Sequence, residues 1–370
     1  MKNSPFSAQK DQVNARQIAF CAAFILPMGK LLETPSLLSQ YARGDILAPA
    51  LVQFLLQTAV LCLLLFASSK SRFSLLERLQ ARLGKWINAL YILFIVYYLF
   101  ASILPLLDLE KFVYAAFFDT APTTFSFIAF FPLLAFVCAK GLKCLGRCAD
   151  LCLFLFLLPF CALIGMALFE SDLTRLLPFF ERSFKDLSQG FIRSTPHFAD
   201  VALLFPLVAS RRYEEGDGVK ILSGYAVGTA LTLLFFAVFF GVFGGIAPRE
   251  HYAFAKIAQY FSALEVVGRI DLIFVYLLSA VLLFYTCLPL LYATHFTALA
   301  VNTERKTLFS AILAFGAFLF VLFMNKHYDA FYAVISGKFA PVFWLGAYLL
   351  PSFCIFIPKK ENAYAHSTQP

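Results

Sequence analysis

One apolar stretch of the sequence places a lysine among helix-breaking residues. Residues 26–35 read Leu26-Pro27-Met28-Gly29-Lys30-Leu31-Leu32-Glu33-Thr34-Pro35. Proline removes a backbone donor and glycine loosens a helix, so we expect local unwinding over Pro27, Met28, Gly29 and Lys30. Free backbone groups at such a break, with the positive end of the following half-helix, make a site for a carboxylate. The alternative is a proline kink in which Lys30 pairs with Glu33 one turn away.

A second apolar stretch is interrupted in the same way. It contains Ser194-Thr195-Pro196-His197-Phe198-Ala199-Asp200. An ionised group inside a membrane costs about 2.5–3.5 kcal/mol, so Asp200 needs a partner, and we predict that the partner is Lys30. His197 is either a proton-sensitive group of the site or a hydrogen-bonded packing histidine. Pro196, His197 and Asp200 therefore join the candidate ligand-binding residues.

Three further polar residues are candidates for the same site. Tyr97 and Tyr98 can offer hydroxyls to a ligand, although aromatic packing is the commoner role of such residues. Asp271 follows Glu265 and Arg269, which lie four residues apart on one helix face. Asp271 can line a cavity, whereas the alternative is a salt-bridged helix start at the membrane boundary.

The elements that must hold these residues are membrane-spanning helices. Apolar residues make up 61% of the chain and charged residues 14%, and the 46 phenylalanines exceed what one water-soluble core can bury. Repeated apolar stretches have the ~20 residues that cross a bilayer as a helix. The hydropathy predicts about ten spans, at 17–42, 46–68, 86–107, 123–139, 150–169, 188–209, 219–245, 265–293, 307–324 and 338–357.

The basic residues predict the orientation of these spans. With a cytoplasmic N-terminus, the inside segments hold eighteen Lys and Arg and the outside segments nine, as the positive-inside rule requires. The net charge of +8 is thus a topological signal rather than a nucleic-acid patch. We expect a cytoplasmic segment 1–16, a membrane domain 17–357 and a cytoplasmic tail 358–370. Residues 69–85 suit an amphipathic helix on the cytoplasmic surface.

The positions of the two interrupted spans indicate an internal symmetry. They are the first and the sixth of ten, and under the predicted topology they run in opposite directions. This arrangement predicts an inverted repeat of two five-span halves, 17–169 and 188–357, with the ligand site near mid-membrane. Gly224 and Gly228 form a GxxxG in the seventh span, which predicts close helix packing.

No pattern in the sequence indicates catalysis. There is no P-loop, Rossmann fingerprint, HExxH or GxSxG, so we expect neither an enzyme nor a cofactor. Cys144, Cys148 and Cys152 share a helical stripe, but no CxxC pair or His/Cys cluster accompanies them. We therefore interpret them as small buried hydrophobes and expect no metal site.

Several local patterns resemble the B-subunit family of spore germination receptors (the GerAB/GerKB type). That family lies within the amino acid–polyamine–organocation (APC) transporter superfamily. The matching positions are Gln17, Gly29 and Pro35, Arg78 through Gly84-Lys85, Gly141 and Arg147, and Arg269-Ile270-Asp271. The chain departs from the family's pattern at Lys143, at Gly268, at the interrupted Thr120-Ala121-Pro122, and at Lys30, where a small or neutral residue is usual.

The resemblance implies a function as well as a fold. It implies an all-α protein of ten helices with spans one and six broken, whose ligand pocket is lined by these two spans and by spans three and eight. It also implies an inner-membrane subunit of a spore receptor that senses a small germinant, typically an amino acid. Its partners would be a second membrane subunit and a lipoprotein.

Three other functions stay open. A proton-coupled transporter of amino acids or amines is the main alternative, and it would move its ligand uphill without partner subunits. A membrane scaffold would lack a polar cavity between spans one and six. An ion channel would use the same cavity as a path.

Overall fold

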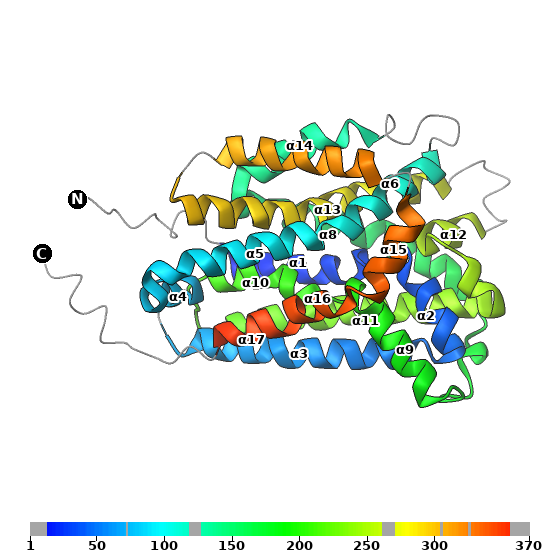
Figure 1. Cartoon of the computed structure of the whole chain (residues 1–370). Helices are drawn as coiled ribbons and strands as arrows, with labels where there is room; N and C mark the ends of the chain where they lie inside the picture. The colour runs from blue at the N-terminus through cyan, green and yellow to red at the C-terminus, as the bar shows by residue number, and fades with distance from the viewer. Residues whose placement is uncertain are drawn as a thin grey trace, which may run out of the picture.

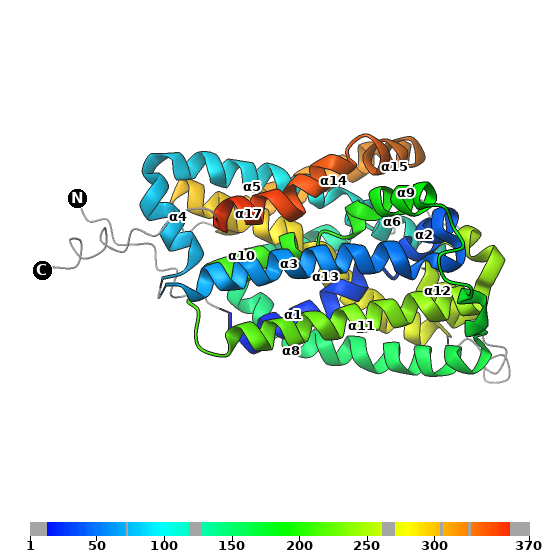
Figure 2. The same cartoon turned by 90° about the horizontal axis from the view of Figure 1, so that it is seen from below.

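The computed structural model describes residues 13–71, 73–117, 127–260, 271–303, 306–324 and 327–355. Within these residues the chain is a bundle of long helices that run roughly along one axis (Figures 1 and 2). The first half contains α1 Ala15–Met28, α2 Thr34–Ala42, α3 Leu47–Ser69, α4 Leu75–Leu83, α5 Ile87–Ala101, α6 Ile103–Phe117 and α8 Phe130–Glu170. The second half contains α9 Phe184–Ser194, η5 Thr195–His197, α10 Asp200–Ser210, α11 Asp217–Phe243, α12 Ala253–Tyr260, α13 Asp271–Val301, α14 Lys306–Met324, α15 Tyr328–Gly337, α16 Ala340–Trp344 and α17 Leu350–Ile355.

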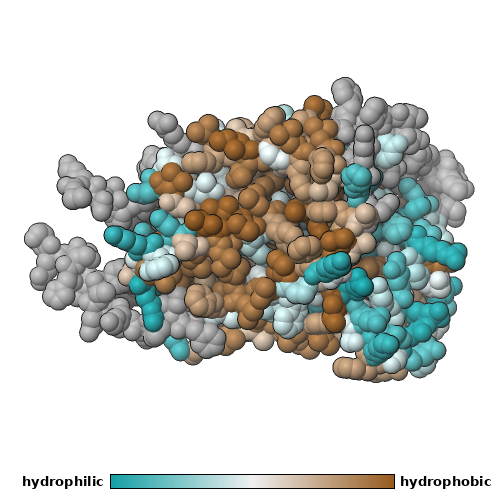
Figure 3. Space-filling view, in the orientation of Figure 1, coloured by the Kyte–Doolittle hydropathy of each residue, from teal (hydrophilic) through white to brown (hydrophobic). Residues whose placement is uncertain are grey.

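The surface of the bundle is that of a membrane protein. Figure 3 shows a hydrophobic middle band with hydrophilic residues gathered at the two ends. Among the described residues, six helices are long and apolar enough to cross a bilayer, and three shorter apolar helices accompany them, at Ala15–Met28, Asp200–Ser210 and Ala340–Cys354. Exposed leucines and phenylalanines such as Leu55 and Phe154 face outward, where lipid solvates them. The chain is therefore a multi-pass membrane protein.

The fourth and fifth predicted spans follow one another in α8, which consists of two helices that meet at a kink at Gly141. A straight helix of 41 residues would measure about 60 Å, twice the hydrocarbon thickness. Gly141 breaks it with φ 74° and ψ −176°, a conformation that L-residues with a side chain rarely adopt. Counting α8 as two spans and adding the three shorter helices to the six long ones gives the ten spans that the sequence predicts.

The helix α4 is the amphipathic surface helix expected between the second and third spans. Ser74 and Glu77 form a capping box at its start, and Leu75, Leu76 and Leu79 are buried. It lies at the end of the bundle where α1 begins and α17 ends (Figure 1). Arg212 binds Glu77 there at 2.8 Å, so this helix is tied to the connection between α10 and α11.

The helix α1 packs against α11 through the predicted GxxxG. A Cβ atom on Gly224 would come within 2.2 Å of the Ala19 carbonyl oxygen, and one on Gly228 within 2.8 Å of the Ala22 oxygen. Backbones can approach this closely where one helix has glycine and the other has small residues at the crossing. The close-packing prediction is therefore confirmed, and α11 fixes the helix that leads to the first break.

Candidate ligand-binding site at two broken helices

The first break follows Met28 and separates α1 from α2. Pro27 lies in the last turn of α1, and Gly29 caps its end by donating its N–H to the Ile25 oxygen at 3.3 Å. The chain runs without helix through residues 29–33, and α2 restarts at Thr34 with a proline in its first turn, where a missing N–H costs nothing. The predicted break is confirmed, but the unwound residues are 29–33 rather than 27–30, since Pro27 and Met28 remain helical.

The backbone of this unwound segment is held by the start of α12. The N–H groups of Ala253 and Phe254 donate to the carbonyl oxygens of Leu32 and Leu31 at 3.0 and 3.1 Å. A buried carbonyl without a donor costs free energy, so these two bonds make the break stable away from water. The second half of the molecule therefore supports the break in the first.

The second break separates α9 from α10 and is supported by α3. Its turn, η5, contains the predicted Pro196, and α10 begins at Asp200. The amide of Gln57 donates to the Phe198 carbonyl oxygen and accepts from the Val201 N–H. Both backbone groups belong to the broken segment, so one side chain replaces the helical hydrogen bonds that are lost there.

A second glutamine, one turn earlier on α3, supports the other side of the same break. Gln53 donates to the Phe191 carbonyl oxygen at 2.9 Å and to the Thr195 hydroxyl at 3.1 Å. Tyr348 in turn donates its hydroxyl to the Gln53 amide oxygen at 2.7 Å. The helical segment Leu345–Leu349, between α16 and α17, is thus connected to the sixth span through a buried amide.

Lys30 and Asp200 join the two breaks through a fully buried ion pair. The Lys30 Nζ lies 2.7 Å from each carboxylate oxygen and also donates to the Leu26 carbonyl oxygen at 2.9 Å. The side chains are 0% and 2% exposed. Lys30 follows the carbonyl end of α1 and Asp200 starts α10, so both helix dipoles favour the charge beside them. The predicted pairing is confirmed, and the alternative Lys30–Glu33 pair is wrong.

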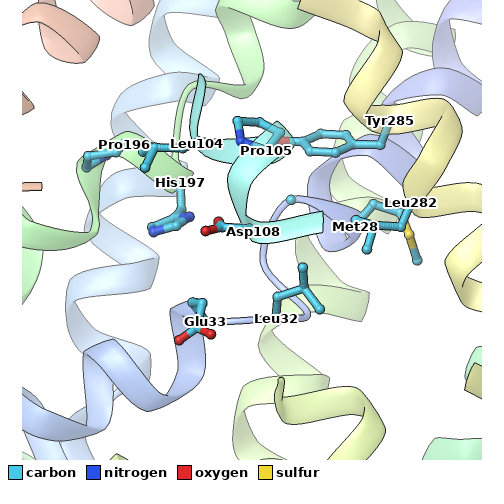
Figure 4. A pocket seen from close by; sticks show the side chains of 11 residues that line it. Met28, Leu32, Glu33, Leu104, Pro105, Asp108, Pro196, His197, Leu282 and Tyr285 are labelled. Atoms are coloured by element: carbon cyan, nitrogen blue, oxygen red, sulfur yellow. The ribbon is translucent and has the colours of Figure 1, made fainter. Parts of the chain in front are cut away.

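A small cavity lies beside this pair, between the two breaks. Its lining comes from the first break, α6, η5 and α13: Met28, Gly29, Leu32, Glu33, Leu104, Pro105, Asp108, Pro196, His197, Leu282 and Tyr285. In Figure 4 the polar Glu33, Asp108 and His197 gather on one side of the view, and the apolar Met28 and Leu282 lie on the other. A cavity between spans one and six therefore exists, with the neighbouring spans that the family resemblance implies.

The size of the cavity limits what can bind in it. The cavity volume is about 30 Å³, whereas one water needs roughly 10–15 Å³ on this measure. Two or three waters fit, and an amino acid needs more space than the cavity offers.

The structure separates the predicted site residues into two groups. Met28, Gly29, Pro196 and His197 line the cavity, and the Lys30–Asp200 pair lies next to them. Pro27 is buried in the last turn of α1.

Tyr97 and Tyr98 are not among the residues that line the cavity. Tyr98 donates its hydroxyl to the Ala202 carbonyl oxygen at 2.7 Å, and its ring stacks on Phe296. Tyr97 packs against Tyr98 and Gly346. Asp271 is the first residue of α13, but its side chain lies outside the described residues, as do Glu265 and Arg269.

Several polar residues of the site were missed from the sequence. Gln53 and Gln57 carry a usable signal, because two amides one turn apart in an apolar span must face protein rather than lipid. Asp108 and Tyr285 carry weaker signals, since one follows the predicted third span and the other is one of many aromatic residues in the eighth.

Glu33 binds a histidine from the opposite half of the chain. The His251 Nδ1 lies 2.7 Å from the Glu33 carboxylate, just before α12. Glu250 and Lys256 are the other charged groups that act on His251. The hydrogen bond to Glu33 raises the pKa of His251 above 6.5. The same carboxylate lines the cavity, so this pair covers one edge of the site.

Replacing His251 with Gln is expected to have a pH-dependent effect on stability. A histidine whose pKa is higher in the folded state stabilises that state fully below its unfolded pKa and loses the contribution as pH rises through the raised value. The difference in thermal unfolding midpoint between wild type and His251→Gln should shrink from about pH 5.5 to about pH 8.5. In a Glu33→Gln background the same difference should change much less with pH; a difference that grows with pH in the wild-type background would contradict this assignment.

The fold has solved relatives among membrane transporters. Two mutants of the manganese transporter of Eremococcus coleocola superpose with TM-scores of 0.59, at 12% sequence identity, over 96% of this chain and 79% of that chain. The same transporter in complex with an aromatic bis-isothiourea substituted compound gives 0.55, at 11% identity, over 96% and 77% of the two chains. The chain thus has a transporter fold of the APC type, with its first and sixth spans broken.

The sequence identifies the family within that class. A family model described as "Spore germination protein" matches residues 46–329, which is most of the chain. A comparison with curated proteins finds no match. The chain belongs to the spore germination protein family, and it is a membrane protein of germination or transport.

Proposed function

We propose that this chain is the membrane subunit of a spore nutrient-germinant receptor that binds a small polar germinant, most simply an amino acid, between the two broken helices. The observation that carries the proposal is the polar-lined cavity between breaks whose backbone is held by other elements. Each break brings polar backbone and side-chain groups to the middle of the bundle. These groups can hydrogen-bond the charged ends of a zwitterion, which has few other polar partners there. Binding would separate the breaks, because the cavity is smaller than an amino acid.

The proposed setting follows from the family and from the charge distribution. The excess of Lys and Arg on one side supports a cytoplasmic location of both termini. Membership of the spore germination protein family supports the inner membrane of the spore as the location of the chain. A second membrane subunit and a lipoprotein would complete the receptor. Movement of the helices next to the breaks would then be transmitted to these partner subunits at the ends of the bundle.

The experiment fills the cavity and measures germination. Leu282 lines the cavity from α13, and Ile273 on the same helix is 58% exposed on the outer surface. Leu282→Trp should abolish germination of complemented spores in a mixture of the standard amino acids, and Ile273→Trp should leave it unchanged. Equal germination of the two variants at equal protein levels would contradict the proposed site.

The second candidate function is proton-coupled transport of an amino acid or amine. It is favoured by the transporter fold and by the titratable His197 and Asp108 at the cavity. Purified chain in vesicles, given an inward proton gradient and radiolabelled amino acids, decides between the two. Uphill uptake by the chain alone supports the transporter, whereas binding without uptake supports the receptor.

A further inference from the structure

The surroundings of the Lys30 ammonium are those of a complete ammonium site. A protonated primary amine has three N–H donors. In Lys30 they face three acceptors at 2.7–2.9 Å, namely the two Asp200 carboxylate oxygens and the Leu26 carbonyl oxygen. The ammonium also lies 4.8 Å from the centroid of the Phe198 ring and 5.4 Å from that of Phe54. Carboxylate, carbonyl and ring faces together are what recognises an alkylammonium group.

The parts of this site come from separate elements of the fold. The carbonyl belongs to α1 and the carboxylate to α10. The ring of Phe54 comes from α3, and that of Phe198 from the turn between η5 and α10. The acceptors thus belong to elements other than the unwound segment that carries Lys30. Beyond its Cβ, Lys30 supplies a three-carbon stem and the charge.

Unused polar groups lie near the same centre. The hydroxyls of Tyr97 and Tyr225 are buried and have no hydrogen-bond partner among the described residues. Both side chains interact electrostatically with Asp200. A buried hydroxyl without a partner is costly, which indicates that another polar molecule meets these groups in some state of the protein.

We propose that this centre is a binding site for a primary alkylammonium group and that Lys30 is its built-in occupant. A free amine then reaches Asp200 and the Leu26 carbonyl only when the Lys30 ammonium withdraws. This inference rests on the proposed function and makes it more specific. The germinant is a primary amine, such as an amino acid, and Lys30 competes with the germinant for the site. Lys30 therefore sets the concentration at which the amine is sensed.

The test replaces the occupant with a free molecule of the same shape. Lys30→Ala removes the atoms of n-propylammonium while the Cβ remains. The full chain, purified in detergent, should gain at least about 3 °C in unfolding midpoint on saturation with n-propylammonium, because the amine binds the folded state alone. Propan-1-ol, which lacks the charge, and tetramethylammonium, which lacks N–H donors, should give no saturable gain.

Two controls make the result specific to this site. Wild type should not respond to n-propylammonium, since Lys30 fills the site, and Lys30→Ala/Asp200→Asn should not respond, since the carboxylate is gone. A gain of the same size in the double variant, or with propan-1-ol, would overturn the proposal, as would no gain in Lys30→Ala. If Lys30→Ala is not recovered folded, its yield from cells grown with and without n-propylammonium is compared, and an unchanged yield also overturns the proposal.

The rescue measures stability, so its outcome is independent of germination. If the rescue fails while Leu282→Trp abolishes germination, the proposal that Lys30 occupies an ammonium site is wrong and the proposed receptor function stands. If the rescue succeeds while Leu282→Trp germinates normally, the ammonium site stands and the receptor function at the cavity does not.

Discussion

Removing one member of the Lys30–Asp200 pair is expected to destabilise the folded chain by about 3–5 kcal/mol. Either Lys30→Met or Asp200→Leu leaves the other charge buried in the bundle with no counter-ion. The double variant Lys30→Met/Asp200→Leu should cost far less, because apolar side chains of similar size then fill the space without an unpaired charge. Unfolding midpoints of the four proteins in detergent form a double-mutant cycle that isolates the pair.

The sign of the coupling decides whether the charges act as a unit. If the double variant loses as much stability as the two single variants together, the pair contributes nothing as a pair. If a single variant is as stable as wild type, the charge that remains finds another partner, and the two breaks are not joined as the structure has them.

A methyl group on Gly224 is expected to disrupt the packing of α1 against α11. Its Cβ would lie 2.2 Å from the Ala19 carbonyl oxygen and 2.6 Å from the Ala19 Cα, and neither backbone atom can rotate away. Gly224→Ala must therefore move α1 relative to α11, with an expected loss of about 1–3 kcal/mol. Because α1 leads into Gly29 and Lys30, the displacement also reaches the site.

The matched control is a glycine in a helix with open space around it. A Cβ on Gly165 in α8 meets nothing within 4 Å. Gly165→Ala should be neutral or raise stability by up to about 1 kcal/mol, since alanine is the better helix former. Thermal unfolding of both variants under one condition tests the difference, and equal midpoints would mean that α1 and α11 do not pack closely.

The two ends of the ion pair explain why the pairing was predictable from the sequence. Each charge lies in an interrupted apolar span, and a membrane interior leaves few alternatives to mutual neutralisation. The partner of Glu33 was harder to predict, since a continuous helix would have placed Glu33 one turn from Lys30. The chain is unwound there, so Glu33 points elsewhere and binds His251, 218 residues away in sequence.

The support of the sixth span shows the limit of local patterns. The sequence shows Gln53 and Gln57 as two amides in an apolar span. No local pattern predicts which backbone groups these amides hydrogen-bond. The same holds for Tyr97 and Tyr98, adjacent residues that point to different neighbours. Tyr98 binds the Ala202 carbonyl, whereas Tyr97 packs against Gly346.

Local patterns were enough to predict a membrane bundle, its spans, the two broken helices and the close contact at Gly224, because hydropathy, proline, glycine and helical spacing act over a few residues. Long-range packing was needed to show that α12 holds the first break, that α3 holds the second, and that Asp108 and Tyr285 line the cavity. These contacts connect residues far apart in the chain, and their geometry depends on how whole helices pack against one another.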